Sequence, residues 1–261
     1  MKYIINLLEE AIKKLEQADI ETPKLDAEVL LAHALGCERH ELYTSTGYLL
    51  TYARQKLFEE YVERRKKREP VAYIRGFKEF WSINIKVTPA VLIPRPETEA
   101  VVEKALEIIK NPPFIPPLTK GGILILDLCT GSGCIAAALA TELPEAQITV
   151  ADISNEALEV AKENLAFAKG RVTFIQSNLF EKIPSQSQFD LIVSNPPYIP
   201  SSQMKQLSPE ILRYEPHLAL DGGMDGLDFI TKIKQTAPKF LKPGGWLVME
   251  AGAEVLTWTN S

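Results

Sequence analysis

Apolar residues recur at helical spacing through roughly the first 75 residues of the chain. The first run lies on one face of an expected helix and consists of Ile4, Leu7, Leu8, Ala11, Ile12 and Leu15. A second run starts at Thr22-Pro23, includes Leu25, Val29 and Leu30, and stops at Gly36; a third carries Leu57, Phe58, Tyr61 and Val62. None of these runs carries a chemical motif. We therefore expect residues 1–75 to form a small all-helical domain that recognises a substrate or positions the catalytic part.

The pattern changes after this region. Alternating apolar and polar residues between Phe80 and Val87 predict a short hairpin, which we take as a linker over residues 76–90. From residue 91 to 261, apolar runs typical of buried strands alternate with helical patterns, which predicts an α/β domain with a mainly parallel sheet. Residues 111–122 contain four prolines and two glycines, so we expect a flexible surface insertion there.

Composition limits the function classes. The chain has 261 residues, 46% of them hydrophobic, and a formal net charge of -5, which argues against a protein that coats nucleic acid. Its three cysteines form no metal-ligand spacing, and neither a signal peptide nor a membrane-spanning run is present, so we expect a soluble cytoplasmic protein with reduced thiols. A basic run at Arg64–Arg68 could meet nucleic acid or an acidic partner, or could be a solvated helix end; we assign it no site role.

The most informative stretch is Asn195-Pro196-Pro197-Tyr198. It follows an apolar run that reads as a buried strand, and proline cannot extend a strand ladder, so Asn195 should lie at the carboxyl end of that strand. The Asn195 side-chain oxygen and the Pro196 carbonyl can accept the two N–H groups of a planar NH2, and Tyr198 offers a face for stacking. An ordinary strand exit with surface prolines is the alternative.

A second stretch predicts a cofactor site. A strand beginning at Ile123 runs into the small-residue turn Cys129–Gly133, where glycines let backbone N–H groups approach a ligand. The next strand ends in Asp152, about 20 residues later, where nucleotide-binding units place the carboxylate that accepts ribose hydroxyls. Asp152 could alternatively be a helix-start residue.

With these residues placed, the chain resembles the S-adenosylmethionine-dependent methyltransferases, and most closely the peptide chain release factor glutamine N5-methyltransferases (the PrmC/HemK family). The resemblance is carried, in family order, by residues 92–99 (Leu-Ile-Pro-Arg-Pro-Glu-Thr-Glu), 127–133, 150–154, 195–198, 214–216 and 222–226. It implies a Rossmann-like methyltransferase fold and a reaction that moves a methyl group from S-adenosylmethionine to the Gly-Gly-Gln glutamine of a class I release factor, which modulates translation termination. It also implies a monomer with no metal, no membrane and no direct nucleic-acid requirement.

The resemblance also implies site residues. Those for the cofactor are Cys129, Thr130, Gly131, Ser132, Gly133, Asp152, Asn178, Leu179 and Asn195. Those that hold the glutamine amide are Asn195, Pro196, Pro197 and Tyr198, of which Asn195, Pro196 and Tyr198 are the candidate catalytic residues. Two residues depart from the family pattern: Cys129 stands where glycine is most common, and Asn178 replaces a common aspartate.

A third departure concerns the C-terminus. The family continues after Gly252 with a helix and two strands, whereas nine residues remain here, so we expect the C-terminal strands to be missing. Either the gene is truncated, or the sheet stops at its fifth strand, in which case Trp246–Met249 would form an open hydrophobic edge. Two alternatives to the favoured function stay open. One is a methyltransferase acting on amines of nucleic-acid bases, and the other is an inactive, truncated binding protein.

Overall fold

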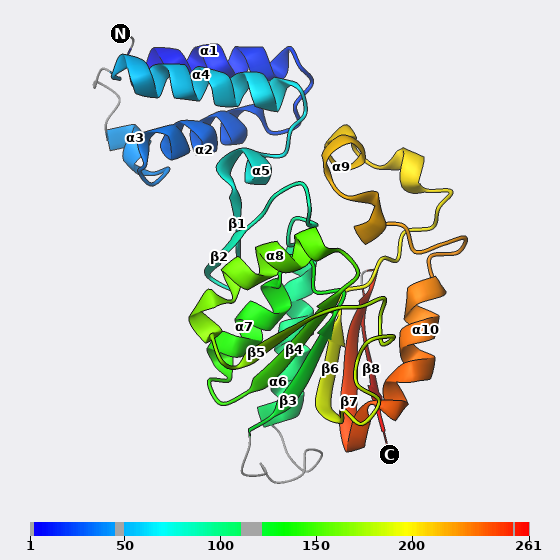
Figure 1. Cartoon of the computed structure of the whole chain (residues 1–261). Coiled ribbons are helices and arrows are strands. Elements are labelled where there is room, and N and C mark those ends of the chain that lie inside the picture. Colours follow the sequence, from blue (N-terminus) through cyan, green and yellow to red (C-terminus); the bar gives the residue numbers. More distant parts are fainter. Residues whose placement is uncertain (1–2, 45–49, 111–121, 253, 261) are drawn as a thin grey trace. The chain divides into compact units, whose positions relative to one another are not determined.

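A computed structural model describes residues 3–44, 50–110, 122–252 and 254–260. The chain forms two compact units, one of Met1–Gly76 with Ser208–Tyr214 and one of Phe77–Leu207 with Glu215–Ser261. Figure 1 shows the elements of both. Apart from Gly122, the expected insertion at residues 111–122 lies outside the described residues.

The first unit is helical, as the spacing of apolar residues predicts. Its helices are α1 (Ile4–Glu16), α2 (Pro23–Leu35), α3 (Glu41–Thr44), α4 (Tyr52–Lys66), α5 (Val71–Arg75) and α9 (Pro209–Tyr214). Gly36 ends α2 in the left-handed conformation, with φ of 68°, as expected for a glycine that terminates a helix. One expected core residue is wrong: Leu25 is exposed, because the buried face of α2 runs through Ala27, Leu30 and Leu31 instead.

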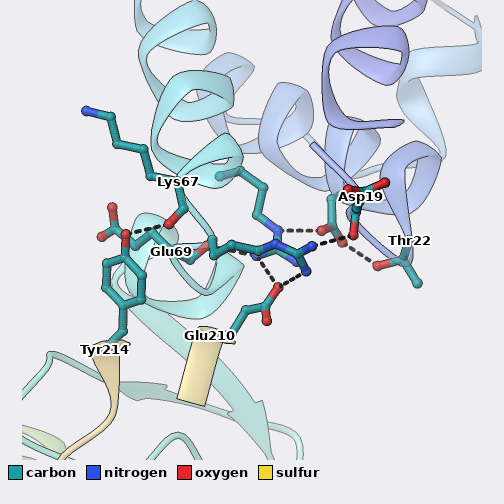
Figure 2. Close-up of polar contacts among 9 residues, drawn as sticks. Asp19, Thr22, Lys67, Glu69, Glu210 and Tyr214 are labelled. Atoms are coloured by element: carbon teal, nitrogen blue, oxygen red, sulfur yellow. Dashed lines mark hydrogen bonds and ion pairs between the residues drawn. The ribbon is translucent and has the colours of Figure 1, made fainter. Parts of the chain in front are cut away.

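The basic run has a structural role that the sequence did not indicate (Figure 2). The Arg65 side chain is buried, donates to Asp26 at 2.7 Å and to Glu210 of α9 at 3.2 Å, and so is not a solvated helix end. Arg68 donates to the same Glu210 carboxylate at 3.2 Å, while the Tyr214 hydroxyl donates to the Lys67 carbonyl at 2.8 Å. Arg65 and Arg68 thus both hold Glu210 of α9, and Arg65 also holds Asp26 of α2.

The second unit contains a six-stranded sheet in the order β5-β4-β3-β6-β7-β8. Its strands are β3 (Leu124–Leu128), β4 (Gln147–Asp152), β5 (Val172–Gln176), β6 (Phe189–Ser194), β7 (Leu241–Ala251) and β8 (Glu254–Thr259). Neighbours from β5 to β7 pair in parallel and β8 pairs antiparallel with β7, which confirms the mainly parallel sheet. All six residues of β6 are buried, including the polar Asp190 and Ser194 at either side of its apolar run Leu191, Ile192 and Val193.

The expectation that the C-terminal strands are missing is wrong. Residues Glu254–Thr259 form β8, which pairs with β7 from Trp246 opposite Thr259 to Ala251 opposite Glu254. Leu247, Val248 and Met249 are therefore buried rather than exposed at an open edge. The expectation failed because the nine residues after Gly252 hold the six-residue strand β8, which β7 completes by pairing along its length.

Helices cover both faces of the sheet (Figure 1). They are α6 (Glu99–Lys110), α7 (Cys134–Glu142), α8 (Asn155–Asn164) and α10 (Asp228–Thr236), with a hairpin of β1 (Phe77–Phe80) and β2 (Ile83–Lys86) before them. Short 3-10 turns are η1 (Pro96–Thr98), η2 (Ala166–Ala168), η3 (Met204–Gln206), η4 (His217–Ala219) and η5 (Ala237–Lys239). Ile230 and Ile233 of α10 pack on the sheet face that carries Leu126, and α6 lies along β6 and β7. Across the described ranges, no helix combines the length and apolarity needed to cross a bilayer.

Candidate functional site

The carboxyl ends of four parallel strands meet around one cavity, as expected for an open α/β sheet. The expected site residues that line it are Cys129, Thr130, Gly131, Ser132, Asp152, Asn178, Leu179, Asn195 and Pro197. The described residues that line the cavity do not include Gly133, Pro196 or Tyr198. The structure thus brings most of the glycine turn, Asp152 and Asn195 to one place, although they lie up to 66 residues apart in sequence.

The Asp152 side chain is hydrogen-bonded directly to the glycine turn. Its Oδ2 accepts the Gly131 N–H at 2.8 Å and its Oδ1 accepts the Ser154 N–H at 2.9 Å. Burial raises the pKa of Asp152, and the backbone donors Ser154, Gly131 and Ile153 oppose that rise. Ser154, not Asp152, caps α8 by accepting the Ala157 N–H, so the helix-start interpretation belongs to Ser154. Each carboxylate oxygen keeps acceptor capacity for a further donor such as a sugar hydroxyl.

Two residues of the turn show why small side chains are favoured here. Cys129 has φ of 57°, a left-handed conformation that costs a residue with a Cβ but not glycine, which accounts for glycine being common at this position. Gly133 faces away from the cavity: a Cβ there would meet the Ala161 Cβ of α8 at 3.1 Å and, at 3.2 Å, Cδ1 of Leu165, the residue that follows α8. Gly133 therefore permits close packing of α8 against the turn.

The polar groups beneath the turn are buried. Asp127 is fully buried, its Oδ2 accepts the Thr130 hydroxyl at 2.7 Å, and burial raises its pKa to about 7. Burial also raises the pKa of Cys129, and raises that of Cys134 to about 12. Both thiols therefore stay protonated at neutral pH and are poor nucleophiles.

Asn178 lies at the end of β5 and is exposed. Its Nδ2 donates to Glu181 Oε1 at 2.7 Å, which turns Oδ1 into the available end of the amide. An acceptor at this point of the cavity suits a donor such as the amino group of a purine. The next residue, Leu179, adds an apolar wall and also has a left-handed backbone, with φ of 49°.

Asn195 is part of a partly buried hydrogen-bond chain that the sequence did not indicate. Its Nδ2 donates to Thr98 Oγ1 at 3.0 Å, and the Thr98 hydroxyl donates to Glu250 Oε2 at 2.7 Å. The other oxygen of Glu250 accepts the Tyr198 hydroxyl at 3.1 Å. Burial raises the pKa of Glu250, against the effect of these two donors, and raises that of Tyr198 to about 12. Thr98 was within reach of sequence reasoning, because it belongs to the stretch 92–99 that carries the resemblance.

A loop after Tyr214 closes another side of the cavity. Pro216, Leu218 and Ala219 line the cavity, and the buried Glu215 ties this loop to Arg95 at 2.6 Å and to the Ile93 N–H at 3.1 Å.

The glycines that follow this loop are required by close approach to Tyr198. A Cβ on Gly222 would lie 2.7 Å from the Tyr198 Cα, and one on Gly226 would lie 2.3 Å from its carbonyl oxygen. Backbone bonds from Ile199 to Leu220 and from Gly222 to Ile199 hold the same approach. The glycine-rich stretch 222–226 thus supports the backbone that follows Asn195.

Comparison with known proteins gives consistent results. The profile described as "PrmC N-terminal domain" matches residues 6–76, and that described as "Methyltransferase small domain" matches residues 116–255. A release factor glutamine methyltransferase of Koribacter versatilis is 41% identical over 96% of this chain and 89% of its own length. One of Geobacter sulfurreducens is 44% identical over 91% of this chain and 80% of its own length.

Solved structures support the fold. The catalytic domain of hMettl16, in complex with MAT2A 3'UTR hairpin 1, superimposes with a TM-score of 0.52 at 15% identity, covering 67% of this chain and 62% of that chain. At this identity the likeness concerns the fold alone.

Proposed function

This chain belongs to the release factor glutamine methyltransferase family, and from that premise we propose how its cavity performs the reaction. The chain is an S-adenosylmethionine-dependent methyltransferase, and its substrate is the side-chain amide of a release factor glutamine. We propose that the methyl group goes to N5 of the glutamine in a Gly-Gly-Gln motif. We further propose that residues 1–75 recognise the release factor, 76–90 act as linker and 91–261 catalyse as a monomer in the cytoplasm.

One observation supports this assignment most strongly: Asn195 shares a cavity with Asp152 and the glycine turn. The donors and acceptors around that cavity suit S-adenosylmethionine. Asp152 has acceptor capacity for ribose hydroxyls, the Asn178 Oδ1 can accept from the adenine amine, and Leu179 supplies apolar surface. Thr130, Gly131 and Ser132 would then lie at the amino-acid end of the cofactor, with Cys129 beside them.

The main task of the protein in this reaction is to position the amide nitrogen of the substrate relative to the methyl group. The cofactor supplies a methyl group activated by its sulfonium. An amide nitrogen is a weak nucleophile, because its lone pair is shared with the carbonyl. The Asn195 side-chain oxygen and the Pro196 carbonyl would accept its two N–H groups and aim the nitrogen at the methyl group, with Pro197 and Tyr198 bordering the amide. The same two oxygens would stabilise positive charge that develops on the nitrogen. Transfer would leave the cofactor sulfur as a neutral thioether, and the positively charged N-methylated amide would be acidic enough to lose one proton to water, so no dedicated base is needed.

The substitution Asn195→Ala tests this proposal. We expect methyl transfer to a release factor, followed by mass spectrometry, to fall by at least about 100-fold, since both the aim and the charge stabilisation are lost. Binding of S-adenosylmethionine, measured by calorimetric titration, should change by less than about threefold. Asn84→Ala, at an exposed asparagine of β2, is the matched control and should keep parental activity.

The same assay separates the two alternatives. If Asn195→Ala still methylates a release factor at near the parental rate, the proposal that Asn195 and the Pro196 carbonyl hold the substrate amide is refuted. Methyl transfer to an adenine or cytosine amine, with none to release factor, would favour the base-amine function. Binding without transfer to either would favour an inactive binding protein.

A further inference from the structure

We infer that Thr98 and Glu250 are positioning residues that fix which end of the Asn195 amide faces the substrate. This inference rests on the proposed function, because it concerns the same amide. It adds two residues, 152 positions apart in sequence, that contribute to catalysis by acting through Asn195.

The direction of each hydrogen bond follows from the chemistry of Glu250. Each carboxylate oxygen accepts one hydroxyl: Oε2 accepts that of Thr98 at 2.7 Å, and Oε1 accepts that of Tyr198 at 3.1 Å. Thr98 has a single hydroxyl hydrogen, which this bond uses. Toward Asn195, the Thr98 oxygen can therefore only accept.

Asn195 must consequently turn its NH2 toward Thr98, which leaves Oδ1 as the end available to a ligand in the cavity that Asn195 lines. The opposite orientation would set the Asn195 oxygen against the Thr98 oxygen with no hydrogen between them. It would also present NH2 donors to a substrate NH2, which has only donors to offer in return. The Glu250 carboxylate, acting through the Thr98 hydroxyl, thus favours the orientation of the Asn195 amide in which its oxygen can accept from a primary amide of the substrate.

The burial of Thr98 and Glu250 stabilises this orientation of the Asn195 amide. The side chains of Thr98 and Glu250 are each 2% exposed, so water does not compete for these bonds. Thr98 is also held by its backbone, since its N–H donates to the Arg95 carbonyl at 3.1 Å in η1. The bond between Thr98 and Glu250 at the centre of the chain is buried and satisfied, which favours a single arrangement of the groups that depend on it.

The experiment compares Thr98→Val, which removes the hydroxyl at nearly constant shape, with Thr98→Ser, which keeps it. We expect Thr98→Val to lower kcat for release factor by about tenfold or more, because the Asn195 N–H loses its acceptor and the amide is free to turn. Thr98→Ser should restore kcat to within about threefold of the parent, and both variants should bind S-adenosylmethionine within about threefold of it. Thr149→Val, the same change on β4, is the matched control.

Glu250→Gln provides an independent measurement if Thr98→Val does not fold. Glutamine offers one side-chain acceptor where glutamate offers two, so the two hydroxyls can no longer both donate to residue 250 and kcat should fall. Because both changes act on one amide, the double variant should be within about threefold of the slower single variant.

Three outcomes would overturn the inference: a kcat for Thr98→Val within about threefold of the parent, equal deficits in Thr98→Ser and Thr98→Val, or multiplicative effects in the double variant. Any of these, combined with inactive Asn195→Ala, would leave the proposed function standing. Active Asn195→Ala would instead refute the proposed function itself.

Discussion

The ion pair between Arg95 and Glu215 allows a quantitative test, because its two partners differ in their access to water. The Glu215 side chain is 2% exposed and that of Arg95 is 29% exposed. Glu215 Oε1 accepts from Arg95 at 2.6 Å, and Oε2 accepts the Ile93 N–H at 3.1 Å. If Arg95 is removed, a buried carboxylate is left with one backbone donor. If the charge of Glu215 is removed, Arg95 can turn to solvent.

The magnitudes follow from this asymmetry. Breaking a buried pair by deleting one partner costs about 3–5 kcal/mol, and since Arg95 is partly exposed we expect Arg95→Ala to lie near the lower end, about 3 kcal/mol. Glu215→Gln keeps an acceptor for the Ile93 N–H and should cost about 1 kcal/mol. In the double variant no charge is buried. It should therefore be more stable than Arg95→Ala alone by about 1–2 kcal/mol.

Urea unfolding followed by tryptophan fluorescence measures these differences in the free energy of unfolding for the structural unit that contains Arg95 and Glu215. All three tryptophans, Trp81, Trp246 and Trp258, belong to the unit of Phe77–Leu207 with Glu215–Ser261. Lys104→Ala removes an exposed pair with Glu107 and, as control, should cost less than about 0.5 kcal/mol. The reasoning is refuted if Arg95→Ala costs no more than Glu215→Gln, or if the double variant is the least stable of the three.

Three further predictions concern the cofactor side of the cavity. Asp152→Ala should weaken binding of S-adenosylmethionine by about tenfold or more in calorimetric titration, because charge-assisted bonds to ribose hydroxyls are lost; unchanged affinity would exclude that role. The folded pKa of Asp127, about 7, lies above the ordinary 3.8, so its contribution to stability is present at acid pH and is lost as pH rises through 7. Asp127→Asn should remove that slope from the stability profile between pH 4 and 7, and an unaltered slope would contradict the assignment. Cys129→Gly should be more stable than Cys129→Ala by about 1 kcal/mol in urea unfolding, since only glycine adopts φ of 57° without strain; equal stabilities would show that the strain is negligible.

Features with a local signal were predictable from the sequence. The buried strand before Asn195 is marked by its apolar run and the prolines after it, and the turn at Gly131 by its small residues. Parallel strands then bring such ends together without further information, which is why Asn195 and Asp152 were expected in one site. The end of α2 at Gly36 is equally local.

The remaining features depend on pairing between distant segments. Glu210 lies 145 residues from Arg65, and Glu215 lies 122 from Ile93, so neither contact leaves a pattern in a sequence window. The strand β8 shows the same limit. Apolar and polar residues alternate only weakly along its six positions. These residues form a strand because the backbone of β7 beside them offers hydrogen-bonding groups to pair with.

The buried acids of the second unit explain how these distant segments are held in register. Asp127, Asp190, Glu215 and Glu250 are each at most 6% exposed, and each accepts at least one donor. In three of the four, a donor comes from a segment more than 60 residues away. A buried carboxylate is costly unless donors reach it, so Asp190, Glu215 and Glu250 favour the arrangement in which their distant partner segments are in place. The residues that line the cavity carry the recognisable motifs, but their placement depends on these acids. It follows that buried acids outside any motif are the first positions to test when a cavity residue such as Asn195 depends on its orientation.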